Sequence, residues 1–173
     1  MYKQLQLFTA NECVWMLGHA QDYINSTVSY DWGRTKHLTG LASSRDRISE
    51  QCNFGQPKGP LHDLLLEKFK VFNFVNLDGT YLSFVRYYQG GFFAKHIDGP
   101  ERYTTAIIQL SNEEDYSGGQ LFVKDTEVSR TQGTTVHFDA NTEHELKLVT
   151  EGQRDALVVW SVKGNLKLKN TLL

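Results

Sequence analysis

The sequence predicts an α+β fold that is mainly β, with a β-sandwich or barrel as its core and two N-terminal helices on one face. From residue 73 onward, short runs rich in Val, Ile, Thr, Phe and Tyr alternate with turn-forming residues. Many short, closely spaced strands are typical of sandwiches and barrels. Before residue 73, two stretches carry apolar residues at helical spacing. A length of 173 residues fits one domain, with a helical N-terminal part over about 1–72 and a strand-rich core over about 73–165.

Two N-terminal segments carry helix-start signals. Thr9 and Glu12 form a capping-box pattern ahead of an apolar run, which predicts a helix from Ala10 to Asp22. Pro60 suits a first helical turn, and "LHDLLLEKFKVF" supplies apolar residues at helical spacing. Residues 24–58 show no clear period, so irregular surface structure or short strands are expected there.

The strand pattern begins at a turn signal. Asp78-Gly79 predicts a hairpin between "FNFVN" and "TYLSFVRYY". Further strands are expected at "TTAIIQLS", "GGQLFVKD", "TTVHFDA", "HELKLVT" and "RDALVVWSV", with "NEEDYSGG", "RTQG", "NTE" and "EGQ" as the spacers.

Composition and charge narrow the function classes. Eighteen Lys and Arg against twenty Asp and Glu give a formal charge of −2, which argues against a nucleic-acid binder built on phosphate neutralisation. Cys13 and Cys52 match neither a disulfide framework nor a metal motif, so two free thiols in a reducing cytosol are expected. No stretch is apolar enough to span a membrane or to serve as a signal core. We therefore expect a cytoplasmic, intracellular protein.

The stretch "FFAKHIDGPE" contains a candidate half of a metal site. On an extended chain His96 and Asp98 point to the same side and can reach one ion. Among the later histidines, His137 lies inside a strand-like run, whereas His144 follows a loop; ligands at strand rims converge more easily, which favours His144. Two histidines and one carboxylate form the facial triad of non-haem Fe(II) oxygenases. The alternative for His96 and Asp98 is a polar turn after a strand.

Arg154 opens the mostly apolar run "RDALVVW", where an arginine needs a partner. Its planar guanidinium suits bidentate binding of a carboxylate, such as the distal carboxylate of 2-oxoglutarate. The alternative is an arginine at a strand end that reaches solvent. If Glu151-Gly152 form a two-residue turn, Arg154 and His144 fall on opposite faces of the hairpin. An odd-length loop or a bulge in "HELKLVTEGQR" is then required for a shared cavity.

Four landmarks over residues 82–163 occur in the order of a known family: "VRYYQGGFFAKHID", "DYSGGQLFVKD", the "TQGTTVHF" strand with the histidine at 144, and "EGQRDALVVWSV". The chain resembles the 2-oxoglutarate/Fe(II)-dependent oxygenases of the prolyl 4-hydroxylase-like superfamily, especially its bacterial and viral PKHD-type hydroxylases. The resemblance implies a double-stranded β-helix, or jelly roll, with helices packed on one side. It also suggests a bacterial or viral origin.

The resemblance further implies roles for individual residues. His96, Asp98 and His144 would be the iron ligands, and Arg154 would bind the distal carboxylate of 2-oxoglutarate. Tyr87 and Trp160 match positions beside the cosubstrate, although Trp160 could simply be core. Gln109 stands near where many relatives have Tyr or Phe, and could hydrogen-bond the cosubstrate. Gly118 and Gly119 would be the family's glycine pair, which has a structural role. Glu143 and Glu145 flank His144, and they either support it or are surface residues.

The implied activity is a dioxygenase that uses Fe(II), 2-oxoglutarate and O2, with ascorbate as a candidate supporting reductant, and that releases succinate and CO2. A peptidyl proline is the leading substrate, and a free amino acid or other small metabolite is the alternative. The interval from Asp98 to His144 is short for the family, so trimmed substrate-covering loops are expected. Two other classes stay open: a non-enzymatic metal-binding jelly roll, and a zinc hydrolase on the same triad. We expect no nucleic-acid or membrane partner, and the oligomeric state is open.

Overall fold

The computed structural model describes residues 2–26, 35–37, 46–74 and 77–162, and an antiparallel sheet path runs through most of them. Its order is β1-β10-β6-β12-β4-β3-β5-β11-β8-β9, with β2 beside β3 and β7 beside β12. The strands are β1 (Tyr2–Gln6), β2 (Thr35–His37), β3 (Arg47–Gly55), β4 (Thr80–Tyr88), β5 (Phe92–His96), β6 (Arg102–Gln109), β7 (Tyr116–Gly118), β8 (Leu121–Val123), β9 (Thr126–Glu127), β10 (Thr134–Asp139), β11 (His144–Leu146) and β12 (Val149–Val162).

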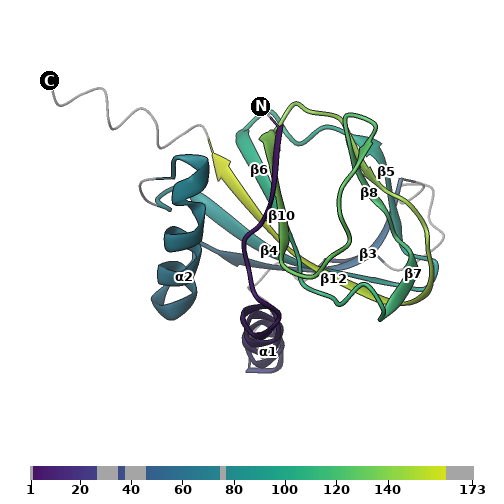
Figure 1. The fold of residues 1–173 in the computed structure, drawn as a ribbon, viewed down its shortest axis with the longest axis horizontal. Coiled ribbons are helices and arrows are strands. Elements are labelled where there is room, and N and C mark those ends of the chain that lie inside the picture. Colours follow the sequence, from purple (N-terminus) through teal and green to yellow (C-terminus); the bar gives the residue numbers. More distant parts are fainter. Residues whose placement is uncertain (1, 27–34, 38–45, 75–76, 163–173) are drawn as a thin grey trace, which may run out of the picture.

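The path folds into two facing layers, which Figure 1 shows from one end. A major layer contains β1, β10, β6, β12 and β4, and a minor layer contains β5, β11, β8 and β9. Strand β3 joins them, because its first residues pair with β5 and its later residues with β4. The predicted double-stranded β-helix is therefore confirmed.

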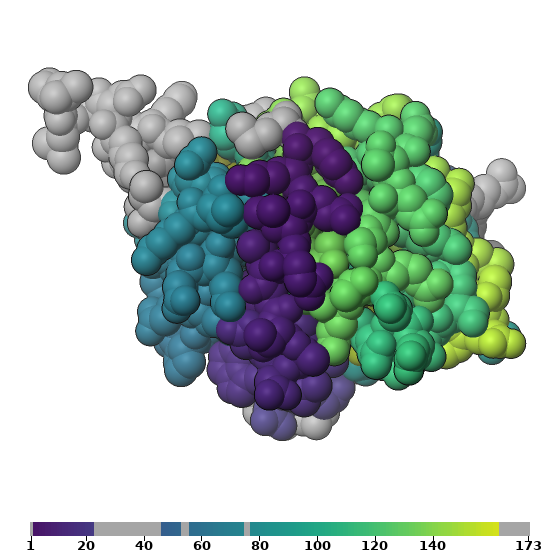
Figure 2. Space-filling model, in the orientation of Figure 1, coloured from purple at the N-terminus to yellow at the C-terminus, as the bar shows by residue number. Residues whose placement is uncertain are grey.

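Helices α1 (Ala10–Ser26) and α2 (Gly59–Phe69), followed by the 3₁₀ turn η3 (Lys70–Phe72), lie outside the major layer. The space-filling view shows β1 and α1 in purple beside the α2 segment on this face (Figure 2). The prediction that two helices cover one face is confirmed. No helix in the described part of the chain is long and apolar enough to cross a membrane.

Period-2 alternation along the major strands produces two separate cores. On β12, Leu157 and Val159 pack with the helices, whereas Ala156 and Val158 pack between the two layers. The same alternation holds on β4 and β6. Both faces of these strands are therefore buried, which explains why their sequences are nearly continuous apolar runs.

The helix starts follow the sequence signals. The Thr9 amide donates to Glu12 Oε2 at 2.8 Å and the Glu12 amide donates to Thr9 Oγ1 at 3.2 Å, so the predicted capping box is present. Helix α1 continues to Ser26, four residues beyond the predicted end, in a stretch without Gly or Pro. Pro60 lies in the first turn of α2, as predicted.

Three strand predictions are wrong. "HELKLVT" is not one strand, because β11 ends at Leu146 and β12 begins at Val149. "FNFVN" contributes no strand in its described residues, because Asn73 ends η3 in the left-handed conformation and Phe74 packs against Phe69. "EGQ" is not a spacer, since β12 runs unbroken from Val149 to Val162. Its register against β7 shifts between Val149 and Glu151. Because Glu151-Gly152 do not form a two-residue turn, the condition that would have put Arg154 and His144 on opposite faces of a hairpin does not arise.

The sheet also extends beyond the expected core of 73–165. β1 pairs with β10, and β3 pairs with β4 and β5, so strands from the N-terminal part complete both layers. Of the segment 24–58, which we expected to be irregular or to form short strands, the described part contains the end of α1, β2, and β3 with nine residues.

Candidate functional site

His96, Asp98 and His144 lie together between the two layers, with ligand atoms all within 4.8 Å of one another. His96 is the last residue of β5, and His144, the first of β11, is its cross-strand partner in the ladder. Asp98 follows β5 by two residues, and its amide donates to Ala140 O at 2.8 Å. The strand ends therefore bring together the three residues that the sequence proposed as metal ligands.

Backbone carbonyls set the orientation of both imidazoles. His96 Nδ1 lies 2.7 Å from Ala94 O, and His144 Nδ1 lies 2.9 Å from Thr142 O. A carbonyl oxygen only accepts, so each Nδ1 carries the proton and each Nε2 keeps a lone pair. This is the arrangement in which a histidine binds a metal through Nε2.

The electrostatics of the site keep both histidines neutral. Burial lowers the pKa of His96 to about 4, and the charge of the neighbouring His144 acts in the same direction. Burial likewise lowers the pKa of His144. Neutral imidazoles are the form that coordinates a metal, so the pair is ready to bind one at neutral pH.

Asp98 is a buried carboxylate that is fixed by three donors. Arg102 Nη1 donates to Asp98 Oδ1 at 2.6 Å, the Thr105 hydroxyl donates to Oδ2, and Trp160 Nε1 donates to Oδ2 at 3.2 Å. The guanidinium of Arg102 also stacks on Trp160, 4.0 Å from the ring centroid. Hydrogen bonds of this kind orient a ligating carboxylate.

The triad opens into a cavity of about 310 Å³ that also contains Arg154. Arg154 is 2% exposed, and its Nη2 donates to Gln109 Oε1 at 2.5 Å. Its Nε has no hydrogen-bond partner among the described residues. A buried guanidinium with an unpaired donor fits a carboxylate that would enter this cavity.

The other residues proposed from the sequence surround the cavity. Tyr87 and Trp160 line it, and Tyr87 is the cross-strand partner of Arg154. Gln109 does not line it; its side chain instead holds Arg154. Glu145 lines the cavity and pairs with Lys147 at 2.9 Å, whereas Glu143 is exposed.

The glycine pair has the structural role that the sequence suggested. Gly118 and Gly119 both have positive φ, at 71° and 63°. A Cβ on Gly118 would lie 2.2 Å from Leu148 O, and one on Gly119 would lie 3.3 Å from Arg154 Cδ. Only glycine allows the β7–β8 turn to pass this close to β12.

His137 belongs to the helix-facing core. It is 4% exposed, stacks on Phe72 at 4.8 Å and contacts Phe74 edge-on. Both ring nitrogens are buried without a hydrogen-bond partner in the part of the chain that the structure describes. Burial lowers the pKa of His137 to about 4, so this ring is neutral and acts as an apolar core residue.

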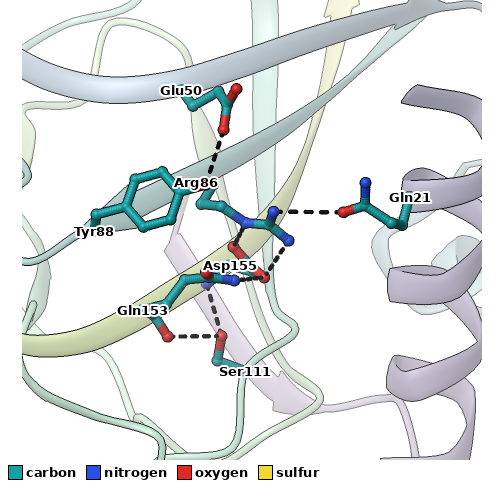
Figure 3. Close-up of polar contacts among 7 residues, drawn as sticks. All are labelled: Gln21, Glu50, Arg86, Tyr88, Ser111, Gln153 and Asp155. Atoms are coloured by element: carbon teal, nitrogen blue, oxygen red, sulfur yellow. Dashed lines mark hydrogen bonds and ion pairs between the residues drawn. The ribbon is translucent and has the colours of Figure 1, made fainter. Parts of the chain in front are cut away.

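A polar cluster lies behind β12, on the face opposite the cavity (Figure 3). Asp155 accepts from Arg86 Nε at 2.8 Å and Nη2 at 3.0 Å, and from Gln153 Nε2 at 2.9 Å. Arg86 also reaches Gln21 on α1. Successive residues of a strand point to opposite faces, so this cluster fixes Asp155 toward the helices and thereby Arg154 toward the cavity.

The sequence analysis missed three residues of the site. Arg102 and Thr105 follow Asp98 by four and seven residues, and that short spacing was the only available signal. Arg47 lines the cavity from the start of β3, within the segment that showed no period. Nothing in its local sequence indicated this position.

Comparisons with known proteins are consistent with this geometry. Residues 82–162 match the family model of the 2OG-Fe(II) oxygenase superfamily. A PKHD-type hydroxylase from Hyphomonas neptunium is 29% identical over 152 residues, covering 76% of this chain and 67% of that protein. Another, from Pseudomonas putida, is 34% identical over 90 residues, covering 43% of this chain and 40% of the relative.

Solved structures share the fold. A Pseudomonas putida prolyl-4-hydroxylase has a TM-score of 0.68 at 17% identity, covering 93% of this chain and 91% of that one. A viral collagen prolyl hydroxylase from Paramecium Bursaria Chlorella virus-1, solved as a 2OG complex, has a TM-score of 0.64 at 20% identity, covering 92% and 94%.

Proposed function

Because residues 82–162 of this chain match the family model of the 2OG-Fe(II) oxygenase superfamily, we propose that it is an Fe(II)- and 2-oxoglutarate-dependent dioxygenase that hydroxylates an unactivated C–H bond. The observation that carries the proposal is the shared cavity. It holds a His-Asp-His triad, of which Asp98 and His144 are buried, and a buried arginine with an unpaired donor. A metal-binding jelly roll without catalysis, or a zinc hydrolase, has no use for that arginine.

His96, Asp98 and His144 would hold the metal through Nε2, a carboxylate oxygen and Nε2. Two histidines and one carboxylate are the ligand set of non-haem Fe(II) oxygenases and leave coordination positions open. When bound, Fe(II) with 2-oxoglutarate and O2 supplies oxidation of a C–H bond, with conversion of the cosubstrate to succinate and CO2.

Arg154 would bind the distal carboxylate of 2-oxoglutarate, with Gln109 fixing one edge of the guanidinium and leaving Nε for the cosubstrate. Arg102, Thr105 and Trp160 would hold Asp98 in its ligating orientation. Between these polar groups the cavity wall is apolar, formed by Val85, Ile107, Leu121, Leu146, Ala156 and Val158 among others. Such walls exclude water from the reacting atoms.

A peptidyl proline is the substrate that we propose first. It is supported by the PKHD-type relatives and by the prolyl hydroxylases among the structures that share this fold. A free amino acid or other small metabolite is the alternative.

Succinate formation tests the proposal. Purified protein is incubated under air with Fe(II), ascorbate and 2-oxoglutarate, with and without proline-containing peptides. We expect Fe(II)-dependent succinate formation that is abolished in His96→Ala and weakened in Arg154→Ala mainly through a higher KM for 2-oxoglutarate. Stimulation by a peptide would indicate the substrate class. Absence of succinate, together with no binding of 2-oxoglutarate to iron-loaded protein, would refute the dioxygenase assignment.

A further inference from the structure

Arg47 is a second arginine of the cavity whose role the proposed reaction leaves open. It is the first residue of β3 and the cross-strand partner of Phe93 on β5. Its guanidinium carbon lies 4.5 Å from the centroid of the Phe93 ring, and that ring stacks on His96 with centroids 3.5 Å apart. Arg47 therefore lies on the His96 side of the cavity.

A hydrogen bond fixes one edge of the Arg47 guanidinium, and the Phe93 ring also contacts it. Arg47 Nε donates to Ser49 Oγ at 2.6 Å, and Ser49 is buried. Within the described residues, no hydrogen bond involves the two Nη groups of Arg47 and no ion pair involves its charge. The terminal edge of the guanidinium is thus available, and this edge binds carboxylates in a two-point contact.

The charges of the cavity leave two cations uncompensated. Asp98 is paired with Arg102 at 2.6 Å, and Glu145 is paired with Lys147 at 2.9 Å. Arg154 and Arg47 also line the cavity, but their side-chain hydrogen bonds go to the neutral groups of Gln109 and Ser49. A partly or fully buried guanidinium that lines a cavity favours an anionic partner. The charges of the cavity therefore favour the binding of two anionic groups, and the distal carboxylate of 2-oxoglutarate would be one of them.

We propose that Arg47 binds a carboxylate of the hydroxylated substrate, so that the preferred substrates of this chain carry a negative charge close to the carbon that reacts. The inference rests on the proposed dioxygenase function and specifies its substrate. The carboxylate has two possible sources. It is either an acidic side chain next to the proline of a peptide or the α-carboxylate of a free amino acid.

Matched probe pairs distinguish these sources. One pair is N-acetyl-glutamyl-prolinamide and N-acetyl-glutaminyl-prolinamide, and the other is L-proline and L-prolinamide. Two quantities are measured for each probe: the concentration that half-maximally stimulates succinate formation, and the Kd for anaerobic protein loaded with Fe(II) and 2-oxoglutarate. We expect the carboxylate member of one pair to bind about tenfold more tightly than its amide, as for a charge-assisted two-point contact.

Substitutions assign the effect to Arg47. Arg47→Gln should abolish the preference for the carboxylate without changing the KM for 2-oxoglutarate, and Arg47→Lys should retain part of it. Lys95→Gln is the matched control, because it removes the same charge from β5 at an exposed residue that pairs with Asp125 and does not line the cavity. It should retain the full preference.

Three results would overturn the inference: binding of neither carboxylate probe, an unchanged preference in Arg47→Gln, or an increase in the KM for 2-oxoglutarate in that variant. Failure of the dioxygenase proposal is seen separately. It would appear as absent Fe(II)-dependent succinate formation together with no binding of 2-oxoglutarate to Fe(II)-loaded wild-type protein, whatever the probes bind.

Discussion

Replacing Gln109 by leucine should weaken the binding of 2-oxoglutarate although Gln109 itself does not line the cavity. The Gln109 side chain accepts a hydrogen bond from Arg154 Nη2 at 2.5 Å, and both residues are buried to 2% exposure. Leucine fills a similar volume but accepts no hydrogen bond. The guanidinium would then lose the group that fixes its position on the floor of the cavity.

The size of the effect follows from the type of contact. A hydrogen bond to a charged group contributes about 1.5–3 kcal/mol, and about 1.4 kcal/mol corresponds to a factor of ten in affinity. If the position of Arg154 determines how tightly the distal carboxylate binds, the KM for 2-oxoglutarate should rise at least about tenfold. The kcat at saturating cosubstrate should change little.

Gln109→Glu separates positioning from general destabilisation. A carboxylate at this position would pair with Arg154 and would compete with 2-oxoglutarate for it, so the KM should rise further than in Gln109→Leu. Initial rates of succinate formation across a 2-oxoglutarate titration give KM and kcat for both variants, and urea unfolding gives their stability. Equal KM values for wild type and both variants would refute the positioning role.

Two further predictions concern stability. Asp155→Ala leaves the guanidinium of Arg86 without its bidentate partner, and should lower the free energy of urea unfolding by about 3–5 kcal/mol, the usual cost of breaking a buried pair; a loss below about 1 kcal/mol would contradict this. The pKa of His137 is lowered to about 4 by burial, and the unfolded chain binds more protons than the native state between that value and about 6.5. The free energy of unfolding should therefore be highest above about pH 6.5. It should fall by up to about 3 kcal/mol as the pH drops from about 6.5 to the pKa of the folded state. His137→Phe should reduce this slope, and an unchanged slope in urea titrations at several pH values would argue against the assignment.

Much of the fold could be predicted because it follows from local chemistry. The capping box at Thr9, Pro60 in the first turn of α2 and the apolar runs of the strands act over a few residues each. "EGQ" was mistaken for a loop because the same residue types form turns and strand irregularities. Gly152 has a φ of 72° inside β12, where pairing with β7 and β4 keeps the strand continuous.

The residues of the site also differ in whether the local sequence could indicate them. His96 and Asp98 are neighbours in sequence, and Arg154 was noticeable as a charge in an apolar run. The contact of Gln109 with Arg154 joins residues 45 positions apart that meet only because β6 and β12 are adjacent. Arg47 reaches the cavity through pairing of β3 with β5, which no pattern within residues 24–58 could indicate.

The most direct test of the central claim, that one cavity holds the metal on the triad and the cosubstrate on Arg154, is an anaerobic calorimetric titration of 2-oxoglutarate. We predict one site per chain in Fe(II)-loaded wild-type protein, and much weaker binding in metal-free protein and in His96→Ala. Arg154→Gln should bind at least about tenfold more weakly, since removing one partner of a buried charge pair costs about 2 kcal/mol or more. Equal affinity in wild type and Arg154→Gln, or binding that does not depend on the metal, would contradict the account.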